Sequence, residues 1–241
     1  MKINSTIEFG QLSDEFKKHL QFLDIFNIKG ATSMLLFGLY DIPLLLSLLT
    51  IYKIEFIWGI LPLLVILHAW MFRLLFKNPF STQFETILYL GAFGLIGSLT
   101  FIIMIYGISY YVLGISSVIY YSVLTLTLLM SSIILIKYQI DKYAGDLTKE
   151  KKSRDQSKYI GLVTVAPAIG YILALITADT TILKHSVTLG MNFILFLIYG
   201  YFGARFLHKY FFMKTNIDYV NFQMPAKKDY KELIKNGVEI K

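Results

Sequence analysis

The chain has 241 residues, of which 56% are hydrophobic and only 16% are charged, and its mean hydropathy is +0.59. These values exclude a soluble domain, whose surface would need more charge. The chain has no cysteine, which excludes disulfides, thiolate nucleophiles and cysteine metal sites.

Residues 1–31 predict a cytoplasmic amphipathic segment. Several acidic residues interrupt this stretch, so it lacks the unbroken apolar core of a cleaved signal peptide. Ser13 suits a helix N-cap and Gly30 suits the end of the same helix. Phe16 and Leu20 share one face, and this face fits a helix lying on the inner membrane surface. It fits equally a helix packed on the underside of a bundle.

Six apolar runs follow, each long enough to cross a hydrocarbon core of about 30 Å. They span 32–52, 54–72, 86–107, 112–136, 160–178 and 186–207. Together they make residues 32–207 a transmembrane domain, and the remainder is too short to bury a catalytic core of its own. The predicted fold class is therefore all-α: an integral membrane bundle of six transmembrane helices, followed by a basic tail at 208–241.

A polar residue stands in the middle of the first span. A carboxylate such as Asp41 costs at least about 2.5 kcal/mol at the centre of a membrane helix, so it is expected to have a partner. Counted at about 1.5 Å per residue from the tight turn at Lys53, Asp41 and His68 lie roughly 18 and 22 Å deep and can meet. Pro43 and Pro62 each remove a helical hydrogen bond near the same depth. Asp41, His68, Pro43 and Pro62 form the candidate intramembrane polar site.

The sequence leaves two interpretations of this site open. In the first, freed carbonyls beside Asp41 line a polar cavity, as broken helices do in transporters. In the second, Asp41 is neutral or hydrogen-bonded and fixes the packing of the helices.

Small residues at spacings of three or four predict close contacts between helices. They are Gly91, Gly94 and Ser98 in the third run, Gly170 and Ala174 in the fifth, and Gly200 and Ala204 in the sixth.

The basic residues fall almost entirely on alternate connections between the spans. Only Lys53 and Lys184, of 23 basic residues, would lie on the outer side. Because cytoplasmic loops retain positive charge, both termini are predicted to be cytoplasmic in the cell membrane. The net charge of +7 then reflects this bias and an attraction to anionic lipid headgroups, and it gives no reason to expect nucleic acid as a partner.

The connection between the fourth and fifth spans holds the densest basic cluster. Its members are Lys149, Lys151, Lys152 and Arg154. A mixed run of charges of this kind fits a collar that binds lipid headgroups, and it fits a docking surface for a cytoplasmic or membrane partner.

No motif of catalysis appears in the chain. There is no phosphate-binding loop, no nucleophile elbow and no histidine pair at the spacing of a zinc helix. The sequence therefore predicts a protein that is not an enzyme and has no catalytic residue, cofactor or metal.

The Lys-, Ile-, Tyr- and Phe-rich composition, the amphipathic N-terminus and the basic inner loops resemble small polytopic membrane proteins of low-GC Gram-positive bacteria, in particular those encoded with type VII secretion and toxin systems. This resemblance implies an accessory or immunity role, exerted by binding another membrane protein or a toxin. The chain also resembles the six-span permease subunit of ABC-2 exporters, which implies transport through a cavity around Asp41. The outer connection at 179–185 departs from that second family, because it is too short for the family's re-entrant structure.

Overall fold

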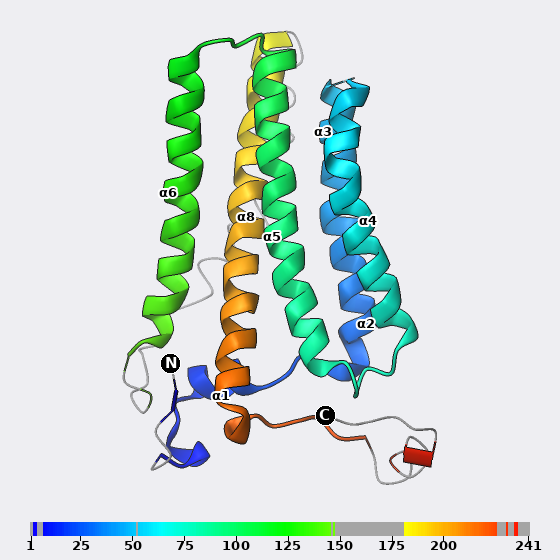
Figure 1. The fold of residues 1–241 in the computed structure, drawn as a ribbon, viewed down its shortest axis with the longest axis vertical. Coiled ribbons are helices and arrows are strands. Elements are labelled where there is room, and N and C mark those ends of the chain that lie inside the picture. Colours follow the sequence, from blue (N-terminus) through cyan, green and yellow to red (C-terminus); the bar gives the residue numbers. More distant parts are fainter. Residues whose placement is uncertain are drawn as a thin grey trace.

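The computed structural model describes residues 2–3, 7–51, 53–145, 147, 181–225, 230 and 234–235. The regular structure of these residues is entirely helical, and five of the helices are long and apolar enough to cross a membrane. They stand side by side as an upright bundle, with short helices across one end (Figure 1). The all-helical fold is confirmed and the apolar helices indicate a membrane protein, whereas the count of six spans stays a prediction.

The first crossing is one continuous helix in three parts: α2 (Ile25–Ser33), the π-helix η2 (Met34–Asp41) and α3 (Ile42–Ile51). Gly30 lies inside α2, so the prediction that it ends the N-terminal helix is wrong. One glycine within a helix costs only about 1 kcal/mol. Ending the helix within lipid would leave backbone groups without hydrogen bonds, which costs more, so the helix continues through Gly30. The apolar span accordingly begins at Ile28.

Two long helices continue the bundle. α4 (Ile54–Phe76) returns antiparallel to the first crossing, and Pro62 lies within it without ending it. α5 (Gln83–Gly107) runs back up and continues into a short π-helix, η3 (Ile108–Val112). The two π-helical stretches are local widenings of spans that are otherwise α-helical.

The next helix, α6 (Val118–Tyr143), begins later than the sequence suggested. A fourth span starting at Val112 is wrong, because Val112 ends η3 and the chain then turns at Gly114, whose φ of +65° is left-handed. Ser117 then caps α6 by accepting a hydrogen bond from the backbone of Tyr120 at 3.4 Å.

The last described span is α8 (Thr181–Thr215). The predicted fifth span at 160–178, with Gly170 and Ala174, lies outside the described residues. Tyr143 ends α6 at the lower end of the bundle, whereas Thr181 begins α8 at the upper end (Figure 1).

Glycines bring α5 and α8 into direct backbone contact. A Cβ atom at Gly94 would overlap the backbone of Gly203, and one at Gly91 would overlap Leu207. The predicted contact of the third span is therefore confirmed for Gly91 and Gly94. Gly200 faces two neighbours, since a Cβ there would lie 3.1 Å from Leu135 of α6 and 3.5 Å from Ser98 of α5.

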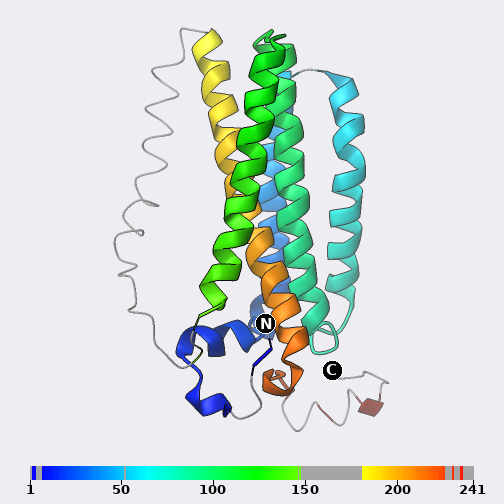
Figure 2. The same ribbon diagram turned by 60° about the vertical axis from the view of Figure 1, so that its left-hand side comes forward.

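The lower end of the bundle, where α4 meets α5 and where α6 and α8 end, is called the basic end below, and the opposite end, at Lys53, the far end. Beneath the basic end lies a layer that we call the platform, made of residues 2–3, 7–24 and 216–225. It contains η1 (Phe9–Gln11), α1 (Asp14–Leu20) and η4 (Ile217–Tyr219). Figure 2 shows α1 lying across the ends of α6 and α8.

The apolar face of α1 is covered by protein. Phe16 and Leu20 are buried, and the Phe16 ring packs against Tyr143 of α6 and Phe212 of α8 at centroid distances of 5.7 and 6.1 Å. Of the two interpretations of this segment, packing on the underside of the bundle is confirmed.

Candidate functional site

Asp41 and His68 meet inside the hairpin of the first two spans. His68 Nε2 lies 3.0 Å from Asp41 Oδ2, and His68 Nδ1 lies 2.9 Å from the carbonyl oxygen of Leu64, one turn earlier in α4. The His68 and Asp41 side chains are 25% and 29% exposed. The prediction that these two residues pair is confirmed.

The geometry places one shared proton on this pair. A carbonyl oxygen can only accept, so Nδ1 of His68 carries a hydrogen and donates it to Leu64. The contact between Nε2 and Asp41 then needs one more hydrogen, on either atom. The pair is either an imidazolium beside a carboxylate or an imidazole beside a carboxylic acid, and its net charge is zero in both states. Neutrality lowers the cost of holding it within a membrane.

The carboxyl group of Asp41 keeps unused acceptor capacity. Its Oδ1 atom is buried and has no hydrogen-bond partner within the described part of the chain. A carboxyl oxygen offers about two acceptor sites, so Oδ2 can accept a further bond beside the one to His68. Asp41 therefore remains an acceptor for a ligand in either protonation state.

Asp41 and His68 lie at one end of a groove of about 460 Å³ between the first span and α4. The other lining side chains are aliphatic: Ile42, Leu44, Leu45, Leu48, Leu64 and Val65. Ile42, Leu45 and Val65 are each more than half exposed. The groove therefore opens sideways from the described bundle, toward the surface that lipid would cover.

Pro43 and Pro62 were predicted to belong to this site, but neither lines the groove. Pro43 has no N–H to donate to the carbonyl oxygen of Leu39, four residues earlier in the helix. The hydroxyl of Tyr199 in α8 donates to that oxygen instead. The bond that Pro43 removes is thus replaced by a contact between helices, which favours packing over a carbonyl-lined path at this point.

The interior beside the site is filled by aromatic side chains. Tyr40 is fully buried and its hydroxyl lies 2.8 Å from that of Thr100 in α5. The rings of Phe93, Phe101 and Tyr199 surround the Tyr40 ring at centroid distances of 5.8 to 6.3 Å. This part of the described interior is packed, which places the opening of the Asp41 site on the side of the bundle.

A second buried polar pair lies at the basic end. His19 of α1 and His208 of α8 are 189 positions apart in sequence, and His19 Nε2 lies 3.1 Å from His208 Nδ1. Tyr143 stacks on both rings, at centroid distances of 3.8 and 5.0 Å. The sequence analysis missed this pair, because no local pattern connects α1 with the last span.

The histidine pair is suited to a hydrogen bond and not to a metal. No third histidine, aspartate or glutamate completes a metal-binding group in the residues that the structure describes. Burial is the main cause that lowers the pKa of His19 to about 2, and His208, Lys209 and Arg205 add to it. A neutral His19 and nearby cations both point to a structural latch that holds α1 against α8.

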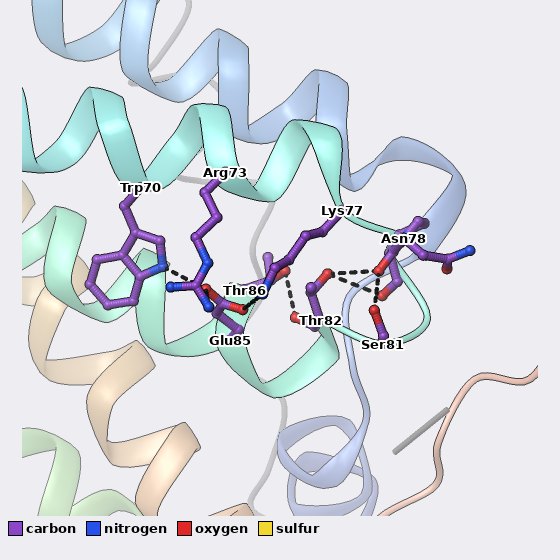
Figure 3. Close-up of polar contacts among 9 residues, drawn as sticks. Trp70, Arg73, Lys77, Asn78, Ser81, Thr82, Glu85 and Thr86 are labelled. Carbon is purple, nitrogen blue, oxygen red and sulfur yellow. Dashed lines mark hydrogen bonds and ion pairs between the residues drawn. The ribbon is translucent and has the colours of Figure 1, made fainter. Parts of the chain in front are cut away.

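Ion pairs organise the turn between α4 and α5, as Figure 3 shows. Glu85 lies 3.3 Å from Arg73 and 3.6 Å from Lys77, and Trp70 Nε1 donates to it at 3.2 Å. Asn78 fixes the turn by accepting a hydrogen bond from the backbone of the second residue after it, at 2.9 Å. The Arg73 and Lys77 side chains are 58% and 45% exposed, so they remain available to headgroups or a partner.

The two ends of the chain are joined within the platform. The Gln83 side chain at the start of α5 donates to the carbonyl oxygen of Gln223 and accepts from its backbone nitrogen, both at 3.0 Å. Asn216 accepts from the backbone of Ile3 at 2.6 Å, and Tyr219 donates to the carbonyl oxygen of Ile7 at 2.9 Å. These bonds bridge more than 200 positions of sequence in the last two cases, so no sequence pattern could reveal them.

The predicted contact cluster of Lys149, Lys151, Lys152 and Arg154 lies outside the described residues. Other basic residues do gather at the basic end, including Lys17, Arg73, Lys77, Lys142 and Lys214, whereas Lys53 and Lys184 lie at the far end (Figure 1). The uneven distribution of charge therefore separates the two ends of the described bundle.

No protein-family model, no curated protein and no solved structure matches this chain.

Proposed function

We propose that this chain is a non-enzymatic, multi-pass protein of the cell membrane that acts by binding a partner protein at its platform, in an accessory or immunity role. The platform and both termini face the cytoplasm in this proposal, and the spans hold the platform at the membrane surface. Anionic headgroups around the basic end orient the protein in the bilayer.

The observation that carries the proposal is that the platform is a folded layer. Retention of positive charge inside the cell needs only basic loops, with no tertiary structure. Here side-chain hydrogen bonds of Asn216 and Tyr219 instead join the C-terminal segment to the N-terminal segment, and the Gln83 side chain ties the C-terminal segment to α5. Ordering such segments costs conformational entropy of about 1 to 2 kcal/mol per residue. The folded layer therefore presents a surface of defined shape below the membrane, which a partner protein can bind.

The composition of this surface fits contact with a protein. Phe9, Ile217 and Met224 are 37%, 44% and 61% exposed on the platform. Aromatic residues, methionine and arginine are enriched in protein interfaces. A basic rim around exposed apolar side chains suits a partner with an acidic or mixed surface.

Transport through a cavity around Asp41 is the second candidate. The π-helix that ends at Asp41 favours it, because π-helical turns often mark functional sites. The sideways opening of the groove and the packed aromatic interior argue against a path across the described bundle. Binding is therefore the better-supported function.

The test is affinity purification in mild detergent from membranes of the source organism, with quantitative mass spectrometry. One variant neutralises Lys149, Lys151, Lys152 and Arg154 with glutamine, and a second, Asn216→Ala, disrupts the platform. The control variant neutralises Lys53 and Lys184 at the far end. A specific partner should be recovered at least about tenfold less with either of these two variants and unchanged with the control, and high salt should weaken its recovery because rim charges are screened.

Equal recovery of the same partner with all variants would contradict binding at the platform. Recovery of lipid alone would reduce the basic end to a headgroup collar. Loss of solute transport in cells carrying Asp41→Asn, with transport unchanged in the other variants, would favour transport instead.

A further inference from the structure

We propose that the groove beside Asp41 and His68 is a docking site for a transmembrane helix of a partner protein that carries a basic side chain near its middle. The proposal rests on the proposed function only in assuming a membrane-embedded partner. It concerns a surface within the spans, whereas the platform lies below them.

The first step is the acceptor chemistry of the site. Asp41 Oδ1 has no hydrogen-bond partner among the described residues, and Oδ2 is bonded to His68 alone at 3.0 Å. An unsatisfied acceptor within a membrane costs several kcal/mol. The occupant must therefore bring hydrogen-bond donors.

A primary ammonium or a guanidinium meets this need best. Either group carries several N–H donors and no acceptor. Placed in the groove, it can donate to the Asp41 carboxylate and to Nε2 of His68 at once, in place of the proton that the pair shares. The shared proton is then released to water as the cation enters, so the net charge of the site stays at zero. The new bonds are charge-assisted, and such bonds are about twice as strong as neutral ones.

The direction of the groove identifies the occupant as a helix. Asp41 and His68 form its deep end, and the aliphatic residues continue along α3 to Leu48, roughly 10 Å closer to the far end of the bundle at about 1.5 Å per residue. The site is thus polar at mid-depth and apolar toward the membrane surface. A lipid has the opposite polarity, with its headgroup at the surface and its tail at mid-depth. A membrane helix with one basic residue at its centre has the matching polarity.

The groove is also accessible from the side. Ile42, Leu45 and Val65 line it and are 57%, 59% and 57% exposed in the described bundle. A helix that diffuses in the bilayer can approach this face of the described helices without any opening between them. The aliphatic walls then pack against its apolar residues, as in other helix contacts within membranes.

The test measures association in lipid vesicles by energy transfer. The chain has no cysteine, so Ser116→Cys at the far end provides a single site for the acceptor dye. The probes are synthetic leucine-rich transmembrane peptides labelled with a donor, one with lysine at its centre, one with lysine near its end and one without lysine. The central-lysine peptide should bind at least about tenfold more tightly than the other two.

The variant Asp41→Leu should abolish this preference. If Asp41→Leu does not fold, Asp41→Asn keeps the shape and should weaken the central-lysine peptide at least about tenfold, because the amide lacks the charge. Thr50→Val is the matched control: Thr50 lies in the same helix, bonds only to the carbonyl oxygen of Leu46 and does not line the groove. It should leave binding unchanged.

Three results would overturn the proposal. The first is equal binding of the three peptides to the wild type, or equal binding of the central-lysine peptide to the wild type and to Asp41→Leu. The second is displacement of the peptide by dodecylamine at equimolar amounts, which would make the groove a site for a small amphiphile. The third is energy transfer between copies of the chain that Asp41→Leu abolishes, which would make a second copy the occupant. None of these results depends on the platform, so the proposed function can fail or stand separately.

Discussion

The His68–Asp41 and His19–His208 pairs show how different surroundings give different roles to a histidine side chain. His68 is paired with an acid and shares its proton with Asp41. His19 is paired with His208 among basic neighbours, Lys209 and Arg205, and is held neutral. The first pair can exchange its proton for a cationic ligand, whereas the second can only lose stability when it is protonated.

The latch that holds α1 should therefore weaken in acid. The folded pKa of His19 lies near 2, below the value of 6.5 for a free histidine. Below pH 6.5 the released α1 binds a proton that the docked α1 does not, so protonation favours release. The docking free energy should be complete well above pH 6.5 and should fall toward pH 2, by about 1.4 kcal/mol between pH 7.5 and 5.5. Hydrogen exchange of the backbone amides of Asp14–Leu20 at pH 7.5 and 5.5, corrected for intrinsic rates, measures it.

The control for this experiment is His19→Phe, which keeps an aromatic ring against Tyr143 and cannot be protonated. Protection of α1 in this variant should no longer change between the two pH values. If the change persists, another group, such as His208, controls the latch. If wild-type protection is the same at both pH values, the neutral latch is wrong.

For single residues, the sequence predicted the contacts that follow from the depth of each side chain in the membrane. Asp41 and His68 could be paired because a turn at Lys53 sets both of their depths. The partners of Tyr40 and Tyr199 could not be predicted, because they depend on which helices are neighbours and how each is rotated. The hydrogen bond from Tyr199 to the carbonyl oxygen of Leu39 has no signature beyond Pro43 itself.

At the scale of the elements, the contact of α5 with α8 organises the bundle. Gly94 and Gly203 allow the two backbones to touch, and Gly97 accommodates the ring of Tyr199. In a membrane the hydrophobic effect gives little drive for helix association, so close packing of this kind has to supply it. The sequence analysis named Gly91 and Gly94 in α5 but not Gly97 or Gly203. Each of these two lies three residues after a predicted small residue, so the spacing could have found them, but it could not identify the partner helix.

Gly94→Ala should separate these helices. The added Cβ would overlap the backbone of Gly203, which cannot turn aside as a side chain can. Overpacking of this kind costs about 1 to 3 kcal/mol. The thermal midpoint in detergent, followed by circular dichroism, should therefore fall by several degrees.

Two other helical glycines provide matched controls. A Cβ at Gly59 in α4 or at Gly190 in α8 would have no described atom within 4 Å. Alanine at either position should be neutral or slightly stabilising, since alanine is the better helix former. A Gly94→Ala midpoint at or above that of these controls would show that the contact tolerates a methyl group.

The sequence predicted the positions of most transmembrane helices better than it predicted their first and last residues. Five of the predicted spans overlap apolar helices that the structure describes. Two boundaries were predicted wrongly. At Gly30 the helix continues past a weak helix breaker, and at Val112 the apolar sequence continues although the turn between the helices lies further on, at Gly114. The true start of α6 has a local signal, Gly114 followed by Ser117, that hydropathy ignores.

At the scale of the whole molecule, the two ends of the bundle differ in charge and in structure. The basic end carries the platform, the latch and the ion pairs of Glu85 with Arg73 and Lys77, while the far end holds short turns around Lys53 and Gly114. A membrane protein with such ends should have one fixed orientation, because moving many cations across a bilayer is far more costly than moving a few.

The orientation can be measured with two cysteines in a chain that has none. Ser116 is exposed in the turn before α6 at the far end, and Ser81 is exposed in the turn between α4 and α5 at the basic end. In intact cells an impermeant maleimide should label Ser116→Cys, and it should label Ser81→Cys only after the cells are opened. Both changes replace one oxygen by sulfur, so a difference in labelling reports position and not altered folding. Labelling of Ser81→Cys in intact cells would invert the topology and place the platform outside. Labelling of both cysteines would mean that the charge difference between the ends, large as it is, does not fix the orientation.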